Sequence, residues 1–202
     1  EGTFLDGLKH GYGKEYLNNI IYEGDWINNY KSGYGKLYNN NILEYEGYFF
    51  NNNKSGYGKL YLKNTIYIGY LLNDLYEGEG ELYIDNILYY KGSFKSGLKH
   101  GKGILYKNNY ILYKGDFYND CKQGSGIIYF DNSTNILYKG NLVNDLREGF
   151  GILYWKTGDI LYKGNWSNNM SNGYGCEYDI NNNIIYEGNW NYNNKNFLKK
   201  NL

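Results

Sequence analysis

The chain has 202 residues, of which 28 are Tyr and 28 are Gly, and it has no Pro. Its 21 basic residues are balanced by 21 acidic residues, which argues against nucleic acid as a partner, because such proteins carry a basic excess that displaces counterions from phosphate. Two cysteines make no disulfide framework and no apolar run is long enough to cross a membrane, so the sequence predicts a reducing compartment and no membrane-spanning helix.

The first recurring element is a short run in which aromatic and polar residues alternate. Residues 22–26 read Tyr-Glu-Gly-Asp-Trp, and residues 113–117 and 162–166 follow the same pattern. Alternation with a period of two places Tyr, Gly and the second aromatic residue on one face of a strand and the polar residues on the other. Such runs begin at Tyr22, Tyr45, Tyr67, Tyr90, Tyr113, Tyr138, Tyr162 and Tyr186, and a partial copy opens the chain at Glu1.

The second element is a Gly-x-Gly pair at a fixed distance. Its first Gly stands nine residues after the Gly of the first element, as Gly33 does after Gly24, and a Tyr follows three residues after the pair, as at Tyr38. The interval to the next copy varies in length, and we expect the Asn-rich runs to mark its loops. A rigid segment that alternates with an elastic one predicts a β-hairpin followed by a surface loop.

The constant spacing of the glycines from copy to copy indicates that their role is structural, and two such roles are possible. A Gly either lets a neighbouring aromatic ring lie flat against the backbone, or it forms a bulge or a left-handed turn. The pairs do not resemble phosphate-binding loops, because no helix is predicted after them. The residues after each pair, such as Leu37 and Tyr38, point to opposite faces unless a bulge intervenes.

The composition and the repeats predict an all-β protein. Without Ala or Pro and with Gly at each turn, the chain is a poor helix former, whereas Tyr and Ile suit strands. A single hairpin is marginally stable in water, so we expect about eight hairpins to stack into an elongated, single-layer antiparallel solenoid over residues 1–192. Residues 193–202 are predicted to form a polar, basic tail. Since both ends fall inside a repeat, we expect a segment of a longer protein.

No group of residues predicts a catalytic, metal or cofactor site. His10 and His100 occupy the same repeat position and are expected in turns, about 40 Å apart at the usual strand spacing, which is too far to share a metal. The two cysteines, Cys121 and Cys176, fall at different repeat positions. The residues suggest no nucleophile–base pair, and we expect neither an enzyme nor a cofactor.

Two columns of basic residues are the candidate binding residues. One column stands between the Tyr and the Gly of the first element and becomes basic in the later copies, at Lys91, Lys114, Lys139 and Lys163. The other stands two residues before the Gly-x-Gly pair, at Lys9, Lys31, Lys54, Lys99, Lys122 and Arg147. Such columns are suited to anionic phospholipid or to an acidic protein partner. The alternative is a solvated face that discourages aggregation at sheet edges.

The whole pattern resembles the MORN repeat (membrane occupation and recognition nexus). Residues 7–13 and 97–103, which read Gly-Leu-Lys-His-Gly-Tyr-Gly and Gly-Leu-Lys-His-Gly-Lys-Gly, carry the motif closely, while Leu71, Leu142 and Ile68 depart from it. The resemblance implies an elongated β-hairpin array, often dimeric, that acts in protein scaffolds or contacts phospholipid. It also implies a cytoplasmic, cytoskeletal or inner-membrane-peripheral location, and the composition suits a protist such as an apicomplexan or a ciliate.

These observations predict a non-catalytic scaffold whose surface binds protein partners, with a second copy of the chain as one of them. Tyr-rich surfaces offer large contact area at low entropic cost, which favours protein as the partner. Two alternatives remain at this point. The first is a tether that binds phosphoinositide or another anionic lipid, and the second is an accessory targeting array attached to an enzyme.

Overall fold

The computed structural model describes residues 1–196, which form antiparallel strands joined by short turns and contain no helix. The chain divides into two compact units, Glu1–Leu98 (unit 1) and Lys99–Leu202 (unit 2). The strands of unit 1 are β1 (Gly2–Leu5), β2 (Leu8–Leu17), β3 (Ile20–Ile27), β4 (Tyr30–Asn39), β5 (Ile42–Phe50), β6 (Asn53–Leu62), β7 (Thr65–Leu72), β8 (Leu75–Ile84) and β9 (Ile87–Lys95).

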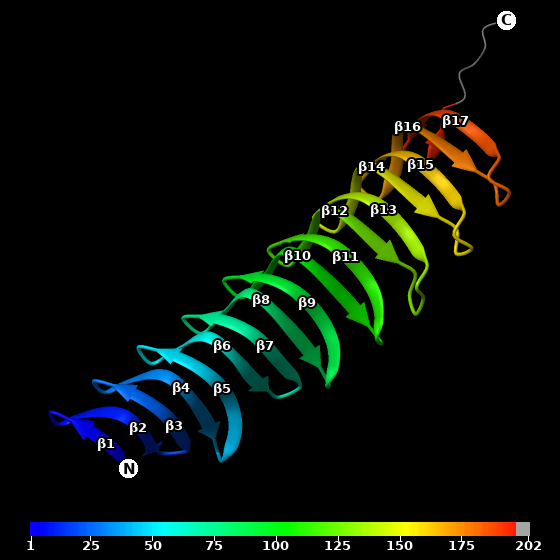
Figure 1. Ribbon diagram of the computed structural model, residues 1–202. Coiled ribbons are helices and arrows are strands. Elements are labelled where there is room, and N and C mark those ends of the chain that lie inside the picture. Colours follow the sequence, from blue (N-terminus) through cyan, green and yellow to red (C-terminus); the bar gives the residue numbers. More distant parts are fainter. Residues whose placement is uncertain (197–202) are drawn as a thin grey trace, which may run out of the picture. The chain divides into compact units, whose positions relative to one another are not determined.

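The strands assigned here to unit 2 begin with β10, whose first residue is the last of unit 1. They are β10 (Leu98–Lys107), β11 (Tyr110–Tyr118), β12 (Cys121–Tyr129), β13 (Ile136–Val143), β14 (Leu146–Tyr154), β15 (Ile160–Ser167), β16 (Met170–Tyr178), β17 (Ile184–Asn191) and β18 (Asn194–Lys195). Within each unit, strands that are consecutive in the chain pair antiparallel with each other, so each unit is a single-layer sheet (Figure 1). The prediction of an all-β, single-layer hairpin repeat is therefore confirmed.

Two-residue turns of a defined type close the hairpins. In the turn between β3 and β4, both Asn28 and Asn29 have positive φ, 49° and 70°. Two consecutive positive φ values define a type I′ turn, whose twist matches that of the flanking strands and which favours Asn and Gly. Asn51 and Asn52 make the same turn between β5 and β6. The Asn-rich runs are thus not confined to the elastic loops, because several of them form the turns inside the rigid segment.

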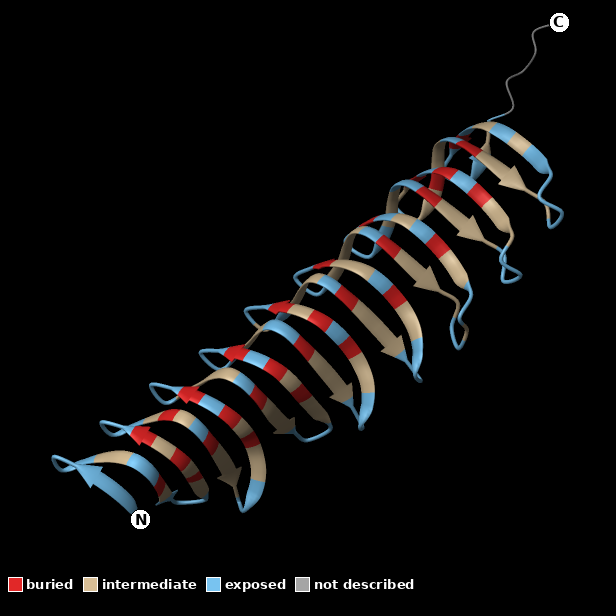
Figure 2. Cartoon of the chain, in the orientation of Figure 1, coloured by how far each residue is buried: buried red, intermediate tan, exposed pale blue. Residues whose placement is uncertain are grey.

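Each core is a row of tyrosines on one face of the sheet, which we call the core face. Tyr22, Tyr45 and Tyr67 are at most 1% exposed, and each donates a hydrogen bond from its hydroxyl to the backbone carbonyl three residues later. The second aromatic residue of the strand packs edge-on against them, as Phe49 does between Tyr22 and Tyr45, at 5.1 Å from each ring centre. Buried positions therefore recur at the same places from hairpin to hairpin (Figure 2).

Both predicted roles of Gly occur, but at different glycines. Gly35, the second of its pair, lies beneath the Tyr22 ring, and a Cβ there would stand 2.5 Å from the Tyr22 hydroxyl. Gly33, the first of the same pair, has a φ of 90° and stands where the pairing of β3 with β4 shifts register. Gly35 therefore leaves room for the ring, and Gly33 forms a bulge. Only Gly fits both places, because it has no Cβ to meet the ring and it adopts a positive φ without strain.

The length variation lies in the loops that connect one hairpin to the next. Two residues separate β4 from β5, whereas residues 130–135 separate β12 from β13. At the carboxyl end, β18 continues the last hairpin into the segment predicted as a tail, and the rest of that tail, residues 197–202, lies outside the described residues. Residues 1–196 include no helix with the length and apolar character that crossing a membrane requires.

Candidate functional site

The column of basic residues before each Gly-x-Gly pair lies on the core face. The Lys122 ammonium stands 5.7 Å from the centre of the buried Tyr113 ring and forms an ion pair of 3.0 Å with Asp145. The Arg147 guanidinium stands 4.2 Å from the Trp166 ring and 5.8 Å from the Tyr138 ring. Burial lowers the pKa of Arg147 from its usual value. These cations cover the aromatic core, so their first role is structural.

The same positions connect each hairpin to the next one. The backbone N–H of Lys122 donates to the Asp145 carboxylate at 3.1 Å, and the backbone N–H of Asp145 donates to the Lys122 carbonyl at 3.0 Å. Burial alone would raise the pKa of Asp145, but hydrogen bonds from Lys122 and its charge lower it overall. We call this pair of bonds the turn clamp. It recurs between Lys9 and Asn29, Lys31 and Asn52, Lys54 and Asp74, Lys99 and Asp120, Arg147 and Asn169, and Ser171 and Asn193.

One copy in unit 1 departs from this arrangement. Tyr76 replaces the cation, and its ring stacks on Tyr67 with the ring centres 3.9 Å apart. Gly97 replaces the Asn or Asp of the turn, so the backbone bond from Gly97 to the Tyr76 carbonyl remains while no side chain can accept the return bond. The aromatic ring therefore takes over the covering of the core that a cation provides elsewhere.

The other predicted column lies on the opposite face, which we call the outer face. In unit 1 the residues of this column and their cross-strand neighbours form a row from β2 to β9 in which lysine and glutamate alternate, except at Ile68. Lys14–Glu23, Lys36–Glu46 and Lys91–Glu81 form ion pairs of 3.4, 3.7 and 2.9 Å. Lys91 is thus neutralised by its cross-strand neighbour. We call this the mixed row, and its members in strand order are Lys14, Glu23, Lys36, Glu46, Lys59, Ile68, Glu81 and Lys91.

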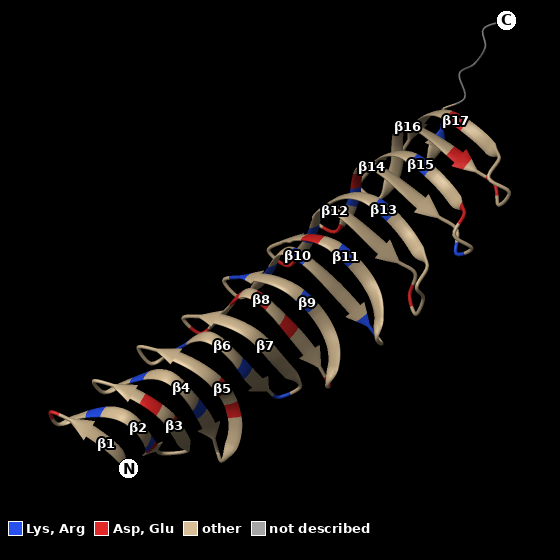
Figure 3. Cartoon of the chain, in the orientation of Figure 1, with Lys and Arg blue, Asp and Glu red and all other residues tan. Residues whose placement is uncertain are grey.

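In unit 2 the corresponding row has a different composition (Figure 3). Lys114 pairs with Ile127, which pairs with Lys139, and the alternation continues through Ile152 to Lys163. All three lysines are exposed and all three isoleucines of the row, Ile104 included, are half-buried. Within the described residues, none of the three lysines has a carboxylate within 4.0 Å. We call Lys114, Ile127, Lys139, Ile152 and Lys163 the lysine row.

A line of exposed tyrosines runs beside the mixed row on the outer face of unit 1. The rings of Tyr34 and Tyr48 meet edge to face with their centres 5.7 Å apart, and those of Tyr57 and Tyr70 do so at 5.5 Å. This tyrosine row comprises Tyr12, Tyr34, Tyr48, Tyr57 and Tyr70, whose exposed fractions lie between 46% and 59%. Sequence reasoning missed it, although the middle residue of three Gly-x-Gly pairs, and the residue after the Gly of the first element at Tyr48 and Tyr70, carried the signal.

Exposed apolar side chains flank the hairpin turns at the edge of the same face. Ile27 and Tyr30 border one turn, and Leu72 and Leu75 border another, each of them about half exposed. Strand alternation places Ile27 on the face of Glu23 and Asp25. The outer face of unit 1 therefore combines two aromatic or aliphatic zones with a row of four lysines and three glutamates, whose charges nearly balance. Contiguous apolar surface of this kind is characteristic of interaction sites.

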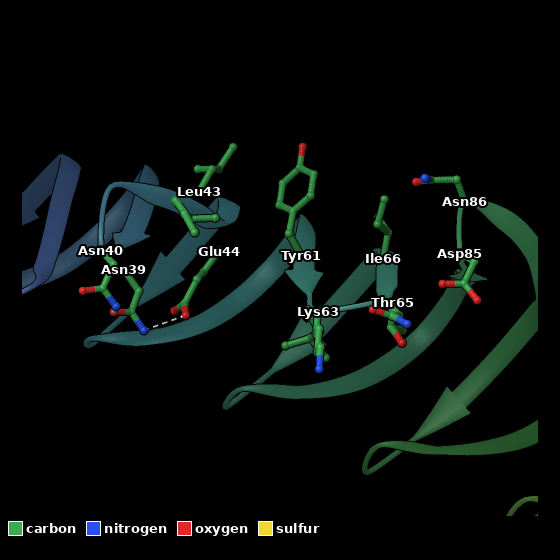
Figure 4. A pocket seen from close by; sticks show the side chains of 13 residues that line it. Asn39, Asn40, Leu43, Glu44, Tyr61, Lys63, Thr65, Ile66, Asp85 and Asn86 are labelled. Carbon is green, nitrogen blue, oxygen red and sulfur yellow. Dashed lines mark hydrogen bonds between the residues drawn. The ribbon is translucent and has the colours of Figure 1, made fainter.

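A groove of about 640 Å³ lies in unit 1 at the ends of the hairpins. It is formed by the turns and strand ends that join β4 to β5, β6 to β7 and β8 to β9, and Leu43, Tyr61 and Ile66 point to the same side of it (Figure 4). The Asn39 amide donates to the Glu44 carboxylate at 2.9 Å. The ionisable side chains of the lining stand on separate turns, an arrangement suited to surface contact.

The histidines are not in turns, which corrects the prediction. His10 lies within β2 and His100 within β10, and the Nδ1 atom of each is buried without a hydrogen-bond partner. The described residues contain no cluster of three or more His, Cys, Asp or Glu side chains that could hold a metal ion. Both cysteines are free and half-buried, and burial raises the pKa of the Cys176 thiol.

Tandem hairpins that bury Tyr over Gly and present two exposed faces define a β-hairpin repeat protein. The MORN repeat family model matches seven segments, residues 1–19, 22–41, 45–64, 90–110, 113–134, 138–160 and 162–184, which is more than half of the chain. The chain therefore belongs to the MORN repeat family. Residues 65–89, which the family model does not match, contain β7, β8 and the exceptional Tyr76, yet β7 and β8 pair as in the other copies. No curated protein matches the chain.

Proposed function

We propose that this chain is a non-catalytic binding array, and that the outer face of unit 1 binds a second copy of the chain. The observation that carries the proposal is the tyrosine row, whose five exposed rings lie beside a row in which lysines and glutamates nearly balance. Tyrosine is enriched in protein interfaces because its large ring buries apolar area while its hydroxyl keeps a hydrogen-bonding partner. MORN repeats commonly contact protein or lipid, and an aromatic face on which charges of both signs alternate favours protein.

The mixed row favours a second copy as the partner. Its signs alternate from strand to strand, so a copy turned by a twofold axis between β4 and β5 meets opposite charges. In that arrangement Lys36 faces Glu46 of the second copy, and Glu23 faces Lys59 of the second copy. The same axis brings Tyr34 and Tyr48 of the two copies together at the centre of the interface, where aromatic residues contribute most.

Charge exchange tests this arrangement. Glu23→Lys alone and Lys59→Glu alone each place like charges opposite each other, so each variant is expected to be monomeric at micromolar concentration. Mixing the two variants sets Lys at position 23 against Glu at position 59 and is expected to restore a mixed dimer. Light scattering after size exclusion measures the outcome. A wild-type chain that stays monomeric at high micromolar concentration would refute self-association, and unchanged dimers in both variants would refute this interface.

A further inference from the structure

The lysine row of unit 2 is a second candidate surface, and it differs from the mixed row in charge. Lys114, Lys139 and Lys163 are separated by isoleucines, whereas the lysines of unit 1 stand beside glutamates. Unit 2 has twelve basic and nine acidic residues, while unit 1 has nine basic and twelve acidic ones. Its partner is therefore expected to be anionic, because the exposed lysines have no carboxylate of their own within the described part of the chain.

The charges lie along one line, and they do not form a patch. On one side of the row, strand alternation places the uncharged Asn141 and Asn165 beside two of the lysines and Asp116 beside Lys114. The Asp116 carboxylate is neutralised by an ion pair with Lys102. Tyr129 and Tyr154 lie on the other side, two residues after Ile127 and Ile152 on the same strands. A linear anion fits this arrangement better than a planar one, since a flat anionic surface would meet mostly uncharged side chains on both sides of the row.

The spacing of the lysines selects one conformation of a peptide. The lysines stand on alternate strands, so neighbours are about 9.6 Å apart across the sheet. A polyproline II chain has three residues per turn and repeats every 9.3 Å, approximately the same distance. Same-side residues of a β-strand repeat about every 6.8 Å, which does not match. An α-helix with residues seven apart repeats about every 10.5 Å and loses register by about 2 Å over three lysines.

We infer that the lysine row binds an acidic peptide in the polyproline II conformation, with Asp or Glu at every third residue. Each carboxylate pairs with one lysine, and the residues between them, proline among them, pack on Ile127 and Ile152 and against the rings of Tyr129 and Tyr154. Aromatic rings beside an apolar trough are the usual contact surface for such chains. This inference is independent of self-association through unit 1, because it uses other residues in the other unit.

A labelled peptide tests the inference on the whole chain. The probe is a peptide of repeated Glu-Pro-Leu triplets, about a dozen residues long to cover four turns. Fluorescence anisotropy is expected to show binding that weakens as salt rises. A peptide of the same composition with its glutamates at alternate positions is expected to bind about tenfold more weakly, because at most two of its carboxylates, six residues apart, can meet lysines at once, and the central lysine is left without a partner. Equal binding of the two peptides would overturn the spacing argument.

Two matched triple variants assign the site. Lys114→Gln, Lys139→Gln and Lys163→Gln together are expected to weaken binding of the triplet peptide by about tenfold or more. Lys14→Gln, Lys36→Gln and Lys59→Gln lie on the same face in the mixed row of unit 1, each across a strand pair from a glutamate. They are expected to leave binding within about twofold, since the glutamates offset their charge. Circular dichroism establishes that both proteins are folded. Equal losses in both variants would overturn the inference.

A vesicle sedimentation assay distinguishes a lipid partner from a peptide partner. Vesicles of phosphatidylcholine with phosphatidylserine are sedimented with the wild-type chain and with the unit 2 triple variant. No binding to the vesicles, or binding that the variant does not change, is expected if a peptide is the partner. Sedimentation that depends on the three lysines, together with no binding of the triplet peptide, would overturn the inference and assign the row to a membrane surface.

Discussion

The guanidinium of Arg147 lies 4.2 Å from the centre of the Trp166 ring and donates a hydrogen bond of 2.7 Å to the backbone carbonyl of Asn169. One side chain thus covers the aromatic core and holds the turn of the following hairpin. Since the guanidinium is half-buried, both contacts are protected from water, which strengthens them.

Replacement of this arginine tests its structural role. Arg147→Ala is expected to lower the free energy of unfolding by about 2 kcal/mol, because it removes a desolvated cation–π contact and a hydrogen bond. Lys156→Ala, at an exposed cation of the same unit, is the control and is expected to change it by less than about 0.5 kcal/mol. Guanidinium denaturation measures both. If both variants lower the free energy of unfolding by a similar, small amount, the Arg147 cation does not stabilise the core.

The glycines beneath the rings are expected to be intolerant of a methyl group. A Cβ at Gly126 would stand 2.3 Å from the Tyr113 ring, whereas one at Gly13 would meet no atom closer than 3.0 Å. Gly126→Ala is therefore expected to lower the free energy of unfolding by about 3 kcal/mol, because it overpacks the core. Gly13→Ala is expected to lower it clearly less. Thermal unfolding followed by circular dichroism compares them, and an equal loss at both positions would contradict the ring-over-glycine packing.

The turn clamp gives a prediction with a built-in control. Asp145→Gly keeps the left-handed turn, as Gly97 does in its own copy, but removes the carboxylate that accepts from the Lys122 backbone. The expected cost is about 1 kcal/mol in the free energy of unfolding. Asp145→Asn restores an acceptor, as Asn169 provides in the next copy, and is expected to recover most of that loss. Urea denaturation distinguishes the three proteins, and identical midpoints would refute the clamp.

The buried phenols predict the behaviour of the protein in alkali. Burial raises the pKa of Tyr138 and of Tyr162 to about 12, and it raises the pKa of Tyr113 further. The unfolded chain ionises its tyrosines near pH 10, roughly two units lower. The folded chain therefore holds the neutral phenol, and this stabilisation is complete below pH 10 and is lost as the pH rises toward 12.

Denaturation at a series of pH values measures this effect. The free energy of unfolding is expected to be nearly constant from pH 8 to about pH 9.5 and to fall steadily above it. Tyrosinate absorbance should show the exposed tyrosines ionising first, with the buried set ionising together as the chain unfolds. A free energy of unfolding that is still constant at pH 11.5, about 1.5 units above the unfolded pKa, would contradict the burial of the phenols.

The hairpins and their faces followed from the amino-acid pattern. Strict alternation in residues 22–26 and the nine-residue interval between Gly24 and Gly33 require two strands joined by a tight turn, because both are local properties of the chain. The Asn pairs that form the I′ turns were also readable, at Asn28 and Asn29 for example, but a composition rich in Asn hid them among runs that look like loops.

The roles of the two basic columns could not be read in the same way. Whether a lysine is neutralised depends on the residue across the strand pair, which for Lys91 is Glu81 and for Lys139 is Ile127 and Ile152. Those neighbours come from other strands, so the same position in the repeat has a glutamate as its partner in one copy and isoleucines in another. Lys122 and Arg147 looked equally available for binding, yet Lys122 lies over the Tyr113 ring of its own hairpin and Arg147 over the Trp166 ring of the next one.

The sequence by itself determined the repeat, the strand pairs and the residues that share one face of a strand, because period and spacing act within one hairpin. Only the tertiary structure decided which cations stabilise the core and which remain exposed in the lysine row, and it alone brought Tyr34 beside Tyr48 on the outer face. The physical reason is that a surface of stacked hairpins is a property of the register between strands, and that register is set by hydrogen bonds between residues far apart in the chain.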